Sequence, residues 1–145
     1  MAHWTMDLNK YAEKKKVEFK EVRKSYAFAL YTSIVKKTPV DTGRARGNWN
    51  ITVGHDETTV STRTTPQFKS PDQMPKVEGD EPIYISNNLP YITKLEYGGY
   101  PKNPKGGSGK TVNGYSKQAP EGMVGLTLAN NENIFNSAVR SVKKV

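Results

Sequence analysis

His55, Asp56 and Glu57 are three consecutive residues with side chains that can bind a metal ion. Imidazole and carboxylate groups are common ligands of zinc. Three consecutive residues in an extended chain, however, alternate in direction and do not all reach one ion. The other histidine, His3, lies near the first residue. We therefore expect solvated turn side chains here and no metal site.

Two further segments carry residue types found in active sites. The 106–110 run, Gly-Gly-Ser-Gly-Lys, is partly similar to a phosphate-binding loop, but Pro104 stands where the first glycine should be. The carboxylates of Glu78, Asp80 and Glu81 lie in a proline-bounded loop, and nothing in the sequence positions them for acid–base work. We expect no catalytic residue and no cofactor, and hence no enzyme.

The elements that would position functional residues meet in the 36–49 segment, Lys-Lys-Thr-Pro-Val-Asp-Thr-Gly-Arg-Ala-Arg-Gly-Asn-Trp. Apolar residues recur at helical spacing before this segment and alternate after it. Pro39 lacks an N–H and disfavours helical geometry at the residue before it, so it ends the helix. Asp41 can accept backbone N–H groups in a tight turn, and Gly43 can take positive φ without strain.

Two arginines follow that turn. We expect Arg44 and Arg46 on an extended segment, where residues two positions apart point to the same side. Two interpretations stay open for Asp41 and these arginines: they only brace a helix-to-strand elbow, or they also bind a partner. An arginine–carboxylate contact can be bidentate, which fixes orientation as well as energy.

A chain of 145 residues with 34% hydrophobic residues and a mean hydropathy of -0.74 predicts one domain, 1–145, with a modest core. The formal net charge of +8 suits nucleic-acid or acidic-protein partners. The chain has no cysteine and no apolar run of membrane-spanning length. Its first residues lack the pattern of a signal peptide. We expect a protein that folds in the cytoplasm and does not contact membranes.

Both ends of the sequence predict helices. The 7–37 segment has apolar residues at steps of three and four, with Asp7 placed as the N-cap. Such a helix is about 45 Å long, which exceeds what the domain needs to cover its own sheet, so its first turns are expected to reach a neighbour. The 120–143 segment predicts a C-terminal helix that begins at Pro120, has Glu121 in its first turn and is weakened at Asn130-Asn131.

The 48–97 segment predicts strands and one short helix. Alternation over 48–54, with Trp49, Ile51 and Val53 on one face, indicates a half-buried strand, and 83–87 indicates another. The threonine-rich 55–65 segment predicts an exposed strand or hairpin arm, and 66–82 a long loop that is functional or ordered by a partner. A short helix over 91–97, with Pro90 at its first position, ends at Gly98-Gly99.

These patterns together predict an α+β fold. We expect a twisted antiparallel sheet packed by the long N-terminal helix and the C-terminal helix. A short helix and long loops complete it, among them a flexible basic loop over 98–119.

Two phrases occur in a defined order. The first, at 37–46, is Lys-Thr-Pro-Val-Asp-Thr-Gly-Arg-Ala-Arg, followed by Asn48-Trp49. The second comprises Ile-Ser-Asn-Asn-Leu-Pro-Tyr-Ile at 85–92, Leu-Glu-Tyr-Gly-Gly at 95–99 and Gln-Ala-Pro-Glu-Gly-Met at 118–123. This order resembles the neck and tail-completion proteins of long-tailed bacteriophages. The resemblance covers 36–49 and 84–123 and extends to the helices by position, whereas 56–82 has no counterpart.

The resemblance implies a non-enzymatic virion protein located in the neck or tail and assembled in the host cytoplasm. Proteins of this kind form a ring, often a hexamer, that completes the tail and helps join it to the head, with DNA passing through. Implied partners are copies of the same chain, adjacent neck, tail-terminator or tail-tube proteins, and non-specifically the DNA. Ring closure needs two different patches on each subunit. We assign to these patches Asp41, Arg44, Arg46, Glu96, Tyr97, Tyr100, Lys102 and Lys105.

Two other classes of function remain. The first is a basic nucleic-acid-binding accessory domain, in which Tyr100 and Tyr115 would stack on bases; its affinity would fall steeply with salt. The second is a small hydrolase, which would need a metal or an organised base. The basic 100–117 loop is where the chain departs most from the resembled family, and it leaves the identity of the neighbouring protein open.

Overall fold

The computed structural model describes residues 2–40, 43–98, 111–112, 115–116, 119 and 121–143, with side chains for 18–40, 43–98, 115–116, 119 and 121–142. Helices and short strands alternate along the described parts of the chain. In order they are α1 (Ala2–Lys37), α2 (Arg44–Gly47), β1 (Trp49–Val53), the 3-10 turn η1 (Pro71–Gln73), β2 (Ile83–Asn87), α3 (Ile92–Tyr97), β3 (Thr111–Val112), β4 (Tyr115–Ser116), α4 (Val124–Ala129) and α5 (Asn131–Lys143).

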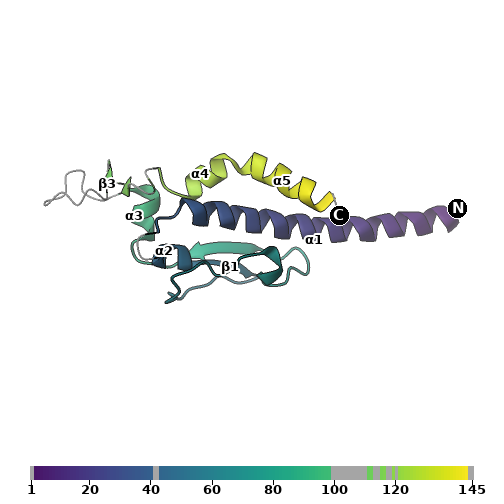
Figure 1. Cartoon of the computed structure of the whole chain (residues 1–145). Helices are drawn as coiled ribbons and strands as arrows, with labels where there is room; N and C mark the ends of the chain where they lie inside the picture. The colour runs from purple at the N-terminus through teal and green to yellow at the C-terminus, as the bar shows by residue number, and fades with distance from the viewer. Residues whose placement is uncertain are drawn as a thin grey trace.

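Helix α1 is the central element of an α+β fold. Helices α4 and α5 run along one side of α1, and the β1–β2 sheet lies on the other side (Figure 1). At 36 residues α1 is about 54 Å long, and its N-terminal part extends past both the sheet and α5 (Figure 1). The fold class predicted from the sequence is therefore confirmed.

Strands β1 and β2 form an antiparallel two-stranded sheet. Trp49 pairs with Asn87 and Val53 with Ile83, so both expected strands are present and the 83–87 bounds are confirmed. Ile51 is buried against α1, as the alternation predicts. A second, smaller antiparallel pair, β3–β4, lies within the 98–119 segment, which we had expected to be a loop throughout.

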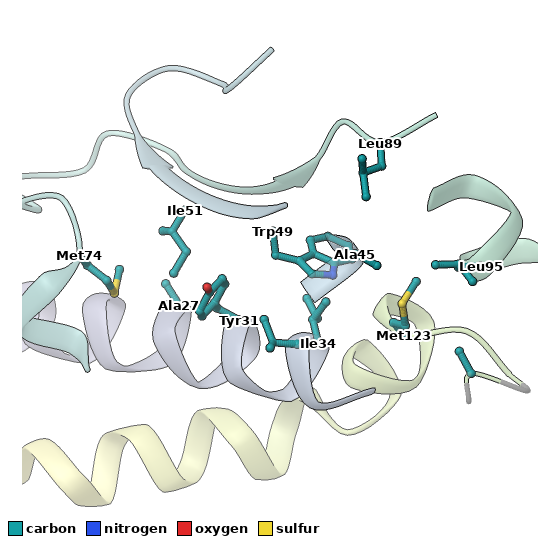
Figure 2. Packing of buried hydrophobic residues seen from close by; sticks show 12 residues of the cluster. Ala27, Tyr31, Ile34, Ala45, Trp49, Ile51, Met74, Leu89, Leu95 and Met123 are labelled. Atoms are coloured by element: carbon teal, nitrogen blue, oxygen red, sulfur yellow. The ribbon is translucent and has the colours of Figure 1, made fainter. Parts of the chain in front are cut away.

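The core lies between α1 and the sheet and extends to α3 and α4. Figure 2 shows Tyr31 and Ile34 of α1 beneath Ile51 and Trp49 of β1, with Leu95 and Met123 at one end. Met123 is fully buried and Tyr31 is 1% exposed. Burying a side chain of this size stabilises the fold by about 1.5–3 kcal/mol. The buried residues form one contiguous cluster, and this cluster holds the long helix to the short sheet.

The ends of α1 differ in how well the sequence predicted them. The helix ends at Lys37, close to Pro39 as expected, and Thr38 then donates its hydroxyl to the Ile34 carbonyl at 2.7 Å. The Thr38 hydroxyl also accepts the indole N–H of Trp49 at 2.9 Å, so the helix end is fixed to the first strand. The expected N-cap at Asp7 is wrong, because α1 begins at Ala2 and Asp7 lies inside it.

The threonine-rich 55–65 segment forms no strand, which corrects the sequence prediction. Its backbone is held by side chains: the amide of Asn48 donates to the Ser61 carbonyl and its oxygen accepts the Ser61 N–H at 2.7 Å. Asn88 donates to the Glu57 and Thr59 carbonyls. The backbone of this segment is thus held to the rest of the fold by Asn side chains and not by pairing with another strand. The segment has too few apolar residues to pack as a strand.

The same segment covers part of the outer face of the sheet. Asn50, on the face turned away from α1, is 4% exposed and Asn48, just before the strand, is 0% exposed, so this part of the face is not solvated as the alternation suggested. Arg63 donates to the Gly47 carbonyl at 2.9 Å and to the Asn50 side chain at 2.8 Å. The outer layer is therefore polar and internally hydrogen-bonded.

The 66–82 loop is ordered by α1 of its own chain. Arg23 donates to the carbonyls of Gly79 and Glu81. Phe68 packs edge-on against Tyr31 with ring centroids 6.2 Å apart, and Met74 is buried in the core. These contacts account for the order of a long loop without a partner.

The C-terminal region departs from the expected single helix over 120–143. It forms α4 and α5, which meet at Asn130, where the sequence predicted weakness. Helix α4 begins at Val124 and not at Pro120, so Glu121 lies before it; Pro120 itself lies outside the described residues. Likewise α3 begins at Ile92, which places Pro90 before the helix.

Candidate interaction surface

The turn that the sequence singles out leads into a short helix. Gly43 has φ 75° and precedes α2, so its predicted positive φ is confirmed. Arg44 and Arg46 lie in α2 and not on an extended segment, so the expectation that they share a side is wrong: residues two apart on a helix diverge by about 200°. Gly47, the last residue of α2, lies against the backbone of Arg63, where a β-carbon would be 2.2 Å from the carbonyl oxygen, so this position has no room for a side chain.

The two arginines accordingly have different surroundings. Arg46 turns back onto the end of α1, where its Nε donates to the Thr38 carbonyl at 2.7 Å and its Nη2 to the Lys36 carbonyl at 3.1 Å. A guanidinium at the C-terminus of a helix also meets the negative end of the helix dipole. Arg46 therefore braces the elbow, a role that both interpretations of the sequence include, whereas Arg44 is exposed.

Glu96 binds the N-terminal end of α4. Its carboxylate accepts the backbone N–H groups of Met123, Val124 and Gly125, each at 2.8 Å. These groups have no partner within the helix, so an acceptor from α3 satisfies them. Glu96 thereby joins the two ends of the 97–121 segment, and its carboxylate has a bracing role within the chain.

Tyr97, the last residue of α3, is the most exposed of the large apolar side chains in the described structure, at 77%. Gly98 follows with φ 78° and ends the helix, as the sequence predicts. An aromatic ring this exposed contributes nothing to the core. It is a residue type enriched at protein–protein interfaces.

The structure brings the helix-to-strand elbow and the C-terminal end of α3, at Tyr97 and Gly98, to the same end of the molecule. Helices α2 and α3 both lie at the C-terminal end of α1 (Figure 1). Asn87, at the end of β2, donates to the Ala45 carbonyl of α2 at 3.0 Å, which fixes α2 to the strand that precedes α3. We call this end of the molecule, defined by Val40, Arg44 and Tyr97, the elbow end. Four of the residues predicted at interfaces, Asp41, Tyr100, Lys102 and Lys105, lie outside the described residues.

An open groove of about 460 Å³ runs along α1 next to the elbow end. Its walls carry two lysines, two hydroxyls and two apolar side chains: Phe28, Ala29, Thr32, Ser33, Lys36 and Lys37. Lys37 donates to the Ser33 hydroxyl, which also bonds to Thr127 at 3.0 Å. The sequence analysis did not predict this groove, whose lining residues all belong to α1.

The acidic residues weighed as chemical candidates hold turns. Glu57 accepts two hydrogen bonds from Thr59, one from its N–H and one from its hydroxyl. These bonds lower the pKa of Glu57, and the bond from the hydroxyl has the larger effect. Glu81 accepts hydrogen bonds from the N–H groups of Glu78 and Gly79. These bonds lower the pKa of Glu81, and the bond from Gly79 has the larger effect. Among the described residues no three His, Asp or Glu side chains gather as a metal-binding group. None of the described helices is both long and apolar enough to cross a membrane.

Comparison of the chain with protein-family models, with curated proteins and with solved structures gave no match.

Proposed function

We propose that this chain is a non-enzymatic structural protein of a bacteriophage virion. In this proposal copies of the chain form a hexameric ring at the head–tail junction, complete the tail and help join it to the head, with DNA passing through. The partners are adjacent neck, tail-terminator or tail-tube proteins. The proposal starts from the order of the two sequence phrases and their resemblance to neck and tail-completion proteins.

The observation that carries the proposal is the meeting of both phrases at the elbow end. The first supplies α2 and the second supplies α3, although the two helices are far apart in the sequence (Figure 1). At this end Tyr97 is 77% exposed and Val40 is 50% exposed, and Arg44, which follows Val40 closely in the chain, is exposed as well. Exposed aromatic, aliphatic and arginine side chains together suit a protein partner better than solvent.

Charge supports a role in which DNA passes close to the protein. The net charge of +8 is unevenly distributed, since 54–82 holds six of the 14 acidic residues and three of the 22 basic ones. The rest of the chain is therefore strongly basic. Such a distribution favours contact with phosphates without any base-reading element.

Electron microscopy of negatively stained, purified protein tests the proposal. We expect ring-shaped particles without DNA, and binding of the protein to the end of isolated tails. Protein that stays monomeric at every concentration and ignores tails would overturn the proposal. Association that requires DNA and disappears with rising salt would instead identify the nucleic-acid-binding alternative.

The elbow end is tested by Arg44→Ala, with Arg140→Ala as its control. Arg140 is also exposed but lies on α5, away from the elbow end. We expect Arg44→Ala to reduce ring formation and Arg140→Ala to leave it unchanged. Equal ring formation by the two variants would remove Arg44 from the interface.

A further inference from the structure

The hydrogen-bonding pattern of the sheet leaves one strand edge open. Gly54 donates to the Pro82 carbonyl at 2.8 Å, which makes this a hydrogen-bonded pair in the register of β1 and β2. Hydrogen-bonded and non-hydrogen-bonded pairs alternate in an antiparallel ladder. The N–H and C=O groups of Ile83, Ile85 and Asn87 therefore point away from β1. We call these groups the β2 edge.

The β2 edge is accessible, whereas the corresponding edge of β1 is buried at two of its three outward residues, Trp49 and Ile51. Trp49 and Ile51 of β1 are 5% and 1% exposed, so their outward peptide groups are shielded as well. Every residue of β2 is partly exposed, and Tyr84 is 37% exposed. The outward groups of the β2 edge make no hydrogen bond to any described residue. A sheet of only two strands with such an edge is a template for further pairing.

A second open edge lies in the 57–63 segment. The peptide groups of Thr59 and Ser61 are held by Asn88 and Asn48 on the side that faces the sheet. The peptide groups of Val60 and Thr62 have no hydrogen-bond partner among the described residues. The chain bends at Thr59 but not over 60–63. In an extended stretch alternate peptide groups point to opposite sides, so those of Val60 and Thr62, on either side of the bonded Ser61, face away from their own sheet. Val60 is 45% exposed.

We propose that the β2 edge of one copy pairs with the Val60–Thr62 side of the next copy. An edge of alternating N–H and C=O groups is matched by an extended backbone, and the threonine-rich 57–63 segment has the composition of a strand without being one. The 57–63 segment does not pair with the β2 edge of its own chain, because its hydrogen-bonded side faces its own sheet and its open side faces away. Two different open edges on each copy give a head-to-tail contact, the type of contact that closes a ring.

The inference rests on the proposed function only in requiring that copies associate. Cysteine cross-linking tests it directly, because the chain has no cysteine of its own. Tyr84→Cys is combined in turn with Thr58→Cys, Val60→Cys or Thr62→Cys, which cover the possible registers. All four positions are exposed, so these substitutions leave the core intact. Controls are each single variant and the pair Tyr84→Cys with Asn133→Cys, whose second cysteine lies on α5.

We expect at least one of the three pairs to give a ladder of disulfide-linked multimers on mild oxidation. Its yield should exceed that of the controls by about tenfold or more, because cysteines in an interface have a high effective concentration. A disulfide within one chain, equal yields in the controls, or efficient dimers of Tyr84→Cys alone would overturn the pairing. Rings visible by microscopy without any of these cross-links would reject the edge contact and leave the proposed function standing. Failure of the unmodified protein to associate at all would reject both.

Discussion

The Glu96 carboxylate accepts the backbone N–H of Met123 at 2.8 Å, and this contact joins α3 to the start of α4. The same carboxylate accepts the N–H groups of Val124 and Gly125. Met123 is fully buried, so its peptide group has no access to water as a substitute partner. Glu96 thus caps the N-terminus of α4, a helix that does not directly follow it in the sequence.

Removing the Glu96 carboxylate should destabilise the protein. We expect Glu96→Ala to lower the free energy of unfolding by about 2 kcal/mol, because it leaves three N–H groups at a helix start without an acceptor. Urea unfolding measures this. The control is Glu121→Ala, an exposed carboxylate next to the same helix, for which we expect a change within about 0.5 kcal/mol. Equal losses in both variants would show that general charge, and not capping, is responsible.

The glycine next to this cap should tolerate no side chain. Gly122 has φ 86°, and a β-carbon there would lie 2.4 Å from the Glu96 carbonyl oxygen. We expect Gly122→Ala to cost about 3 kcal/mol, the sum of backbone strain and the steric clash.

Gly54 provides a matched control for that substitution. Its φ is 85°, almost the same, but a β-carbon there would meet nothing within 4 Å. We expect Gly54→Ala to cost about 1 kcal/mol, from backbone strain alone. Thermal or urea unfolding of the two variants separates strain from clash, and similar losses would contradict the close approach of Gly122 to α3.

Local patterns in the sequence predicted the elements that depend on local physics. Strand 83–87 and the end of α1 at Lys37 follow from alternation and from Pro39. The break between α4 and α5 coincides with Asn130, a poor helix former. These features need few distant contacts, so the residues themselves are enough to indicate them.

The elements that were missed depend on residues far apart in the chain. Helix α2 forms where Gly47 packs against Arg63, and the 55–65 segment loses its strand pairing to the side chain of Asn48. The role of Glu96 requires Met123, which is 27 positions away. Residue types alone do not reveal such pairs, so the sequence did not predict the contacts that Arg46 and Glu96 make within their own chain.

The bond between Trp49 and Thr38 should make a measurable energetic contribution. Thr38→Val removes the acceptor of the buried indole N–H, and we expect it to cost about 2 kcal/mol. Trp49→Phe removes the donor. In a double-mutant cycle measured by urea unfolding, the pair should show a coupling energy of about 1 kcal/mol, since the second substitution has no bond left to break.

Thr38→Ser is the control for this cycle because it keeps the hydroxyl that accepts the indole N–H. The cycle of Thr38→Ser with Trp49→Phe should therefore be additive within about 0.5 kcal/mol. A coupling of the same size in both cycles would mean that packing of the threonine methyl group, and not the hydrogen bond, connects the helix end to the strand.

Tyr31 should make the stability of the protein sensitive to alkaline pH. Tyr31 is 1% exposed, and burial raises the pKa of Tyr31 above the ordinary value of 10.0, although the hydrogen bond from the Phe68 N–H acts in the opposite direction. The unfolded chain therefore loses this proton at a lower pH than the folded chain. The contribution of neutral Tyr31 is complete below pH 10.0 and is lost as the pH rises through the folded pKa.

Replacing this tyrosine should flatten the alkaline limb of the stability curve. We expect the free energy of unfolding of Tyr31→Phe, followed by urea titration from neutral pH to about pH 11, to fall less steeply above pH 10.0 than that of the unmodified protein. Lysines titrate in the same range but are common to both proteins, so their effect cancels in the comparison. If Tyr31→Phe instead follows the curve of the unmodified protein, the phenol of Tyr31 ionises equally easily in the folded and unfolded chains, and its burial does not govern the alkaline response.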